Sequence, residues 1–152
     1  MKSVLISIQP KYVELIASGE KTIEIRKSRP KLETPFKCYI YATKSGDRIV
    51  LKNDRVFEIS KALTGKVIGE FVCDNIDKIG WFGNYKILED RYLEESCLTL
   101  KELYKYTKGE IYYEWHISDL KIYDKPKELS EFYNLKGETI KRAYQGWGYI
   151  NE

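Results

Sequence analysis

Three side chains that can bind an anion or move a proton lie close together in the sequence: Lys21, Glu24 and Arg26. An arginine can hold a phosphate or a base edge with two parallel hydrogen bonds. A glutamate can accept a hydrogen bond from an exocyclic amine, or act as an acid or base when its environment shifts its pKa. The simplest alternative is an ion pair on the surface, which contributes only about 0–1 kcal/mol to stability.

The residues around these three alternate in the manner of a β-strand. Ile23 and Ile25 face one way, while Thr22, Glu24 and Arg26 face the other. The pattern therefore predicts that both isoleucines are buried and that the three polar side chains reach a cleft.

A short helix is predicted immediately before this strand. Pro10 suits the first turn of a helix, apolar residues follow at helical spacing as far as Ser18, and Gly19 is a typical C-terminal cap. Lys21 is thereby placed in a helix-to-strand turn.

The remaining elements are mostly strands. Thr99 and Glu102 form a capping-box pattern, which predicts a helix start near Thr99 within the helical spacing of residues 93–106. Pro126 is expected to start a turn or helix. We also expect a polar loop over 44–54, a helical turn over 58–63, and strands over 3–8, 21–27, 37–43, 65–78, 112–123 and 146–150. Many short strands with few helices favour an α+β fold, a small mixed β-barrel with helices packed at its rim.

Composition predicts one domain spanning residues 1–152, because 43 % hydrophobic and 14 % aromatic residues suffice for one core. No signal segment precedes the first strand, and no apolar stretch approaches the ~20 residues of a membrane span, so we expect a cytoplasmic protein with no membrane contact.

Cys38, Cys73 and Cys97 are widely spaced and form no CxxC pair, so reduced thiols are expected. His116 is the only histidine and is interpreted as structural; no metal or cofactor is predicted.

The net charge of +3 is unevenly distributed. Residues 1–70 carry 14 Lys and Arg against 8 Asp and Glu, an excess of +6, while residues 71–152 carry an excess of −3. A basic region attracts phosphate. Charge alone favours the simpler interpretation, an ordinary solvated surface whose lysines aid solubility.

The first motif resembles the opening of ASCH domains, whose hallmark is Gly-x-Lys-x-x-Glu-x-Arg after a short helix. Gly19, Lys21, Glu24 and Arg26 occupy the four fixed positions. Residues 115–120 and 126–129, and the Gln-Gly-Trp of 145–147, are similar to small phage and bacterial members. The resemblance implies a PUA-like fold, a pseudo-barrel with helices at its rim, and a cleft at this motif that binds RNA.

Some members of that family remove the acyl group of N4-acetylcytidine, and others are ribonucleases. If this chain is an enzyme, the resemblance makes Lys21 and Glu24 its chemical pair. In the amidohydrolases, however, a threonine nucleophile stands where this chain has Glu24, and Ser96 aligns with their catalytic glutamate. We therefore do not transfer amidohydrolase activity.

The leading hypothesis is a module that binds RNA, a nucleotide or a nucleoside through Lys21, Glu24 and Arg26. Thr43 and Lys44 are candidates for the opposite wall. The remaining candidates are aromatic stacking platforms: Trp147 between two glycines, and Trp81 and Phe82 in a glycine-bounded loop. Two other hypotheses stay open, a hydrolase acting on a modified nucleoside or RNA, and a protein adaptor using exposed tyrosines.

Overall fold

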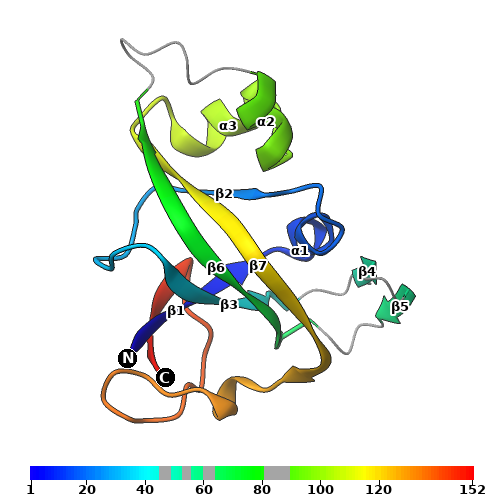
Figure 1. Cartoon of the computed structure of the whole chain (residues 1–152), viewed down its shortest axis with the longest axis vertical. Coiled ribbons are helices and arrows are strands. Elements are labelled where there is room, and N and C mark those ends of the chain that lie inside the picture. The colour runs from blue at the N-terminus through cyan, green and yellow to red at the C-terminus, as the bar shows by residue number, and fades with distance from the viewer. Residues whose placement is uncertain (45–48, 53–55, 60–63, 81–89) are drawn as a thin grey trace.

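A computed structural model describes residues 1–44, 49–52, 56–59, 64–80 and 90–152 (Figure 1). Strands and helices alternate at first, and the two longest strands follow later in the chain. The elements in order are β1 (Lys2–Ile8), α1 (Pro10–Ala17), β2 (Ile23–Arg26), β3 (Phe36–Ala42), β4 (Ile49–Lys52), β5 (Val56–Ile59), β6 (Lys66–Ile79), α2 (Asp90–Ser96), α3 (Leu100–Thr107), β7 (Tyr112–Lys127), a 3-10 turn (Leu129–Glu131) and β8 (Trp147–Asn151).

Six strands form one mixed sheet in the order β2-β7-β6-β3-β1-β8. β1 and β3 are parallel and the other pairs are antiparallel. β6 and β7 form a long ribbon through the molecule, and register shifts along it let the ribbon twist (Figure 1). The α+β class is confirmed. Within the described residues no strand pairing joins β2 to β8, so this order does not establish the expected barrel.

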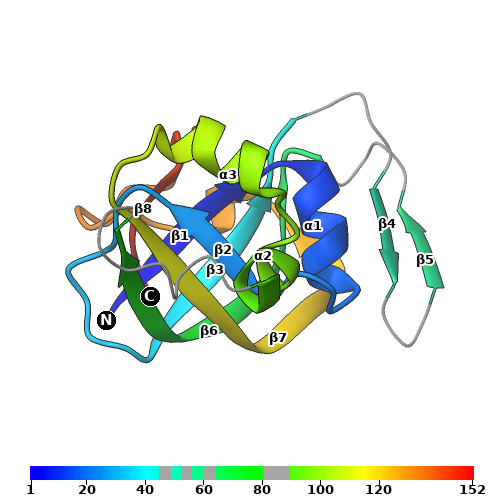
Figure 2. The ribbon, with the colours of Figure 1, turned by 90° about the horizontal axis from the view of Figure 1, so that it is seen from above.

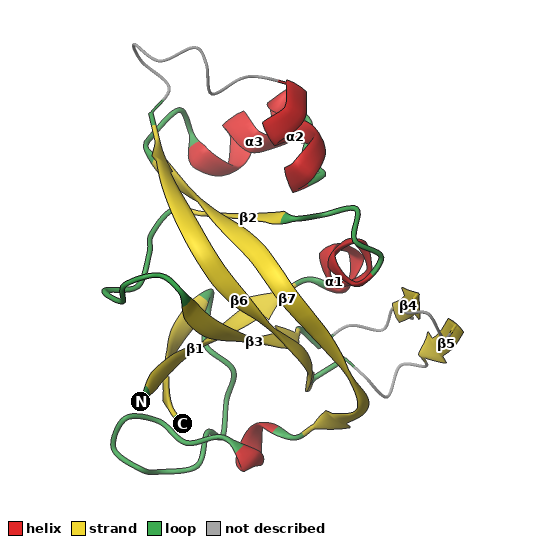
Figure 3. Cartoon of the chain, viewed as in Figure 1, coloured by secondary structure: helices red, strands yellow, loops and turns green. Residues whose placement is uncertain are grey.

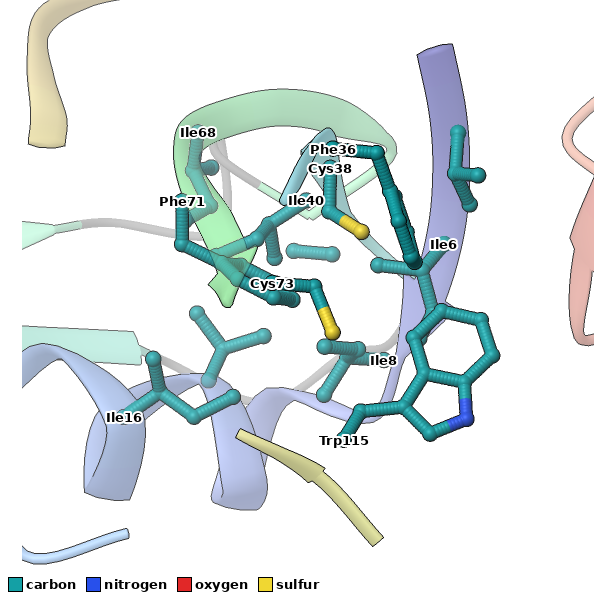
Figure 4. Packing of buried hydrophobic residues seen from close by; sticks show 13 residues of the cluster. Ile6, Ile8, Ile16, Phe36, Cys38, Ile40, Ile68, Phe71, Cys73 and Trp115 are labelled. Carbon is teal, nitrogen blue, oxygen red and sulfur yellow. The ribbon is translucent and has the colours of Figure 1, made fainter. Parts of the chain in front are cut away.

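The main core lies between β1, α1, β3, β6 and β7 (Figure 4). Trp115 is fully buried and packs edge-on against Phe36, with ring centroids 6.0 Å apart. Cys38 and Cys73 are buried among these residues and form no disulfide. Burial raises the pKa of the Cys73 thiol to about 12, so this sulfur stays protonated and unreactive.

A second apolar cluster packs against the face of β2 that carries its two isoleucines. Ile23 and Ile25 are buried with Tyr112 and with Leu103 of α3, which confirms the predicted burial of both isoleucines. α2 and α3 lie together at this end of the β6–β7 ribbon (Figures 2 and 3). None of the helices in the described part of the chain combines the length and apolar character that crossing a bilayer requires.

The helix start predicted at Thr99 is confirmed. The Thr99 hydroxyl accepts a hydrogen bond from the backbone of Glu102, and the Glu102 carboxylate accepts one from the backbone of Thr99, both at 3.1 Å. The preceding residues form the separate helix α2, because Cys97 adopts a left-handed conformation with φ 58° that ends it.

Two predictions over the middle of the chain are wrong. A strand pair, β4 with β5, lies where a loop over 44–54 and a helical turn at 58–59 were expected. Both strands are rich in Val, Ile and Phe, whose preference for strands prevails over the neighbouring turn residues. Residues 60–63 lie outside the described part.

The prediction that Pro126 starts a turn or helix is also wrong. Pro126 lies within β7, and the turn follows it at Leu129–Glu131.

Candidate ligand-binding site

A cavity of about 830 Å³ opens where the β1–α1 junction, β2, α3 and the segment before β8 meet. Its floor comes from β2 and its rim from the two helices and the 143–146 segment. The residues that define its chemistry are Ser7, Gln9, Lys11, Tyr12, Lys21, Glu24, Arg26, Lys27, Thr43, Glu102, Lys105, Tyr106, Lys108 and Gln145.

Lys21 is almost fully buried, with 2 % of its surface exposed. Its Nζ donates to the Ser96 carbonyl oxygen at 2.5 Å and lies 5.2 Å from the centre of the Tyr12 ring. Burial lowers the pKa of the Lys21 ammonium below its ordinary 10.5, although the attraction of Glu24 acts in the opposite direction. The contact with Ser96 ties the start of β2 to the end of α2.

Glu24 lies between two cations. Its Oε2 is 3.9 Å from Lys21 Nζ, and its Oε1 is 3.3 Å from Arg26 Nε. The side chain is 9 % exposed, and the Arg26 side chain is 14 % exposed. Arg26 Nη2 also donates to the Ser7 carbonyl oxygen at 2.8 Å, which links β2 to β1 across the open side of the sheet.

Two atoms of this group make ion-pair contacts but no hydrogen bond. Glu24 Oε2 and Arg26 Nε are buried without a hydrogen bond among the described residues. Buried polar atoms are normally satisfied by protein, water or ligand. Glu24 and Arg26 both line the cavity, and a carboxylate beside a guanidinium suits a bound molecule that carries both a donor and an acceptor.

The rim of the cavity is basic. Lys11, Lys27, Lys105 and Lys108 line it, against the single carboxylate of Glu102. Lys27 Nζ lies 4.9 Å from the centre of the Tyr106 ring, so this aromatic side chain and a cation stand together at the entrance. Part of the basic excess of residues 1–70 thus surrounds the cavity.

Thr43 lines the cavity, as its place opposite the motif predicted. Lys44 does not: its side chain lies over Gly65 and lines a separate cavity of about 560 Å³. Thr22 is exposed and lies outside the cavity lining, contrary to the prediction that it reaches the cleft. Thr22 precedes the first residue of β2, so the strand alternation does not extend to it.

Trp147 does not line the cavity either. Its ring packs against Trp115 at 5.7 Å and Tyr149 at 5.5 Å between centroids, and its Nε1 donates to the Ser28 hydroxyl at 3.0 Å. The flanking glycines suggested an exposed platform, but β8 places the ring against the core. Trp81 and Phe82 lie outside the described residues.

Sequence reasoning missed the contribution of α3. Lys105 and Tyr106 lie in the last turn of α3 and Lys108 caps its C-terminus, a basic and aromatic grouping that was visible in the sequence. It also missed the backbone at Gly146, whose carbonyl accepts from Ser7 N at 2.8 Å and whose φ of 89° suits glycine.

Residues 6–141 match the family model for the ASCH domain. The chain therefore belongs to the ASCH domain family. A crystal structure of ASCH from Zymomonas mobilis is similar, with a TM-score of 0.70 and 21 % identity, over 99 % of this chain and 88 % of that one. A crystal structure of a tyrosine-to-phenylalanine mutant of the same Zymomonas mobilis protein matches equally, at 0.70 and 20 % identity, over 100 % and 92 %. At this identity the likeness shows the ASCH fold alone. A comparison with curated protein sequences found no match.

Proposed function

We propose that this ASCH domain binds RNA or a nucleotide in the cavity around Glu24 and Arg26. The observation that carries the proposal is the pairing of a mostly buried carboxylate with a guanidinium in the lining of one cavity with a basic rim. Arg26 supplies a donor fork to a base edge or a phosphate. Glu24 accepts from the exocyclic amine of cytosine, adenine or guanine.

In this proposal Arg26 contacts the ligand directly, whereas Lys21 does not. Its ammonium is buried and already donates to Ser96, so it positions the Glu24 carboxylate rather than reaching a phosphate. The exposed lysines of the rim are better placed for phosphate contacts. Tyr12 and Tyr106 replace Trp147 as candidate stacking surfaces, and a stacked base contributes about 1–3 kcal/mol.

The size of the cavity supports the same class of ligand. About 830 Å³ lies within the range of roughly 300–1,000 Å³ that holds one small organic ligand. A longer RNA would continue over the lysine rim. We also propose, from the sequence, that residues 1–152 form a single domain with a PUA-like barrel and that the protein is cytoplasmic.

A second candidate function is hydrolysis of a modified nucleoside or of RNA. The observation in its favour is the lowered pKa of Lys21, since burial makes this ammonium beside Glu24 a readier proton donor. Turnover of substrate distinguishes this function from binding alone.

Binding is tested by titrating cytidine, adenosine, guanosine and uridine monophosphates and a short single-stranded RNA into the whole chain by calorimetry. Glu24→Gln is expected to weaken binding of the amino-bearing nucleotides at least tenfold and of uridine monophosphate less, because only the former offer an amine. Arg26→Lys should weaken binding of all four.

Lys136→Gln is the matched control, because Lys136 is exposed and outside the cavity. It should bind like the wild type. Undetectable wild-type binding at millimolar concentration, or affinities unchanged in both cavity variants, would contradict the proposal.

A further inference from the structure

Three side chains that commonly ligate metals meet on the β6–β7 ribbon, away from the cavity. Asp77 belongs to β6, and Glu114 and His116 belong to β7. One ligand atom from each lies within 4.8 Å of the others.

The strand pairing explains this meeting. Asp77 lies directly opposite Glu114 in the antiparallel register. His116 follows Glu114 by two residues, so their side chains leave the same face of β7. That face also carries Ile25 and Ile23 of β2, the partners of Glu114 and His116. The cluster therefore lies on the face that α2 and α3 cover, and Glu24 projects from the opposite one.

The electrostatics of the cluster favour a cation. Glu114 is 1 % exposed, and its carboxylate stands across the strand pair from the carboxylate of Asp77. Directly opposed like charges destabilise a sheet, and a cation between them relieves this repulsion. His116 Nε2 lies 2.8 Å from Asp77 Oδ2, and Asn75 donates to Asp77 Oδ1 at 3.2 Å, so the Asp77 carboxylate is held in place.

We propose that Asp77, Glu114 and His116 bind one divalent transition-metal ion, with Zn²⁺ as the probe. The expectation of no metal from the sequence rested on a single histidine. The fold adds two carboxylates to it, and an imidazole with two carboxylates and water is a ligand set that such ions accept.

The spacing is compatible with an ion. Zn²⁺ binds imidazole nitrogen and carboxylate oxygen at about 2.0–2.2 Å, which keeps neighbouring ligand atoms roughly 3–4 Å apart. The three atoms lie within 4.8 Å of one another, so they must approach by only about 1 Å to reach this spacing. In the bound state the His116 Nε2 lone pair faces the ion, and the direct contact with Asp77 opens. The ion fastens β6 to β7 beneath the helices and has no contact with a ligand of the cavity.

The single histidine of the chain makes the test unambiguous, because its Cε1–H resonance in a proton NMR spectrum has no counterpart. The protein is prepared without a polyhistidine tag, treated with a chelator, and carries Cys97→Ser, since Cys97 is the most exposed of the three thiols. One equivalent of Zn²⁺ is expected to shift this resonance to saturation.

Asp77→Asn should weaken Zn²⁺ binding at least tenfold, measured by the same resonance. This variant keeps the shape of a partly exposed side chain, whereas Glu114→Gln alters a buried one and can impair folding. Asp124→Asn, the same change at an exposed residue further along β7, should bind Zn²⁺ like the parent.

A His116 resonance that Zn²⁺ leaves unmoved would overturn the site. A shift that persists at full strength in Asp77→Asn would also overturn it, because the ion would then bind His116 without the cluster. In either case Asp77 and His116 form an ion pair only. None of these outcomes bears on whether the cavity binds a nucleotide, which is tested separately.

Discussion

At the scale of single residues, the cavity floor holds one carboxylate between two cations, and each of the three is mostly buried. Such a group is costly to desolvate, and its members depend on one another. Removal of Glu24 leaves two adjacent cations, whereas removal of Lys21 leaves Glu24 paired with Arg26. Substitutions at this floor therefore affect stability as well as binding.

The Lys21 pKa gives a prediction about stability and pH. In the folded chain this pKa lies below 10.5, so at pH values between the two the unfolded chain binds more protons than the folded one. The free energy of unfolding must then rise with pH in this window. Urea unfolding of the wild type and Lys21→Met should show the wild type gaining stability relative to the variant between pH 8 and 10. A constant difference would indicate that Lys21 is solvated in the folded state.

The chemistry of Glu24 gives a prediction about catalysis. We expect little or no hydrolysis of N4-acetylcytidine, because a carboxylate stands where the resembling amidohydrolases have a hydroxyl nucleophile. The measurement is deacylation by the purified wild type and by Glu24→Thr.

Robust wild-type turnover would contradict this expectation. In that event Glu24 acts as a general base for water, and Glu24→Gln must abolish the activity. Activity that appears only in Glu24→Thr would support a common cleft whose chemistry depends on this one position.

At the scale of elements, the β6–β7 ribbon sets the shape of the molecule. At Gly69 the two strands lie too close together to leave room for a side chain. A Cβ placed on Gly69 would lie 2.5 Å from the Lys121 carbonyl oxygen, a backbone atom that cannot move alone. The register also shifts between Val67 and Gly69. The missing side chain allows β7 to approach β6 closely at this point.

Gly69→Ala is therefore expected to lower the free energy of unfolding by about 1–3 kcal/mol, the usual cost of forcing a group into a packed site. Gly80→Ala is the matched control, since Gly80 lies just after β6 and a Cβ there meets no atom of the described residues within 4 Å. Its effect should stay within about 0.5 kcal/mol. Equal midpoints of urea unfolding for the two variants would contradict the close approach.

Local patterns predicted the elements near the motif well. The alternation at Ile23 and Ile25 and the capping box of Thr99 depend on neighbouring residues, and both are confirmed. Contacts between residues that are distant in the sequence could not be predicted from such local patterns. Trp147 turns inward because β8 pairs with β1, and Asp77 meets Glu114 because two strands that are distant in sequence pair in one register.

At the scale of the whole molecule, part of the basic excess of the first half meets Lys105 and Lys108, at the end of α3, around one cavity. This distribution matters for a polyanionic ligand more than the modest net charge of +3 suggests. A long RNA would pass over several lysines at once, whereas a nucleotide would meet one or two.

Affinity for single-stranded RNA should therefore fall steeply with salt. Contact with three or four phosphates gives a slope of about −2 to −3 in a plot of log affinity against log salt concentration. Lys105→Gln should make the slope shallower by about 0.7, one phosphate contact, and Lys136→Gln should leave it unchanged. Affinity that does not change with salt would favour a free nucleoside as the ligand.

The pairing of β1 with β8 has a consequence for biosynthesis. Val4, Leu5 and Ile6 are fully buried, yet β1 acquires its β8 neighbour only when residues 147–151 have left the ribosome. Its other neighbour, β3, emerges much earlier and covers one edge alone. Until translation passes residue 151, each nascent chain carries an unpaired apolar strand edge, the feature that chaperones recognise and that promotes aggregation. The rate of elongation between β3 and β8 thus sets how long every copy is exposed to that risk.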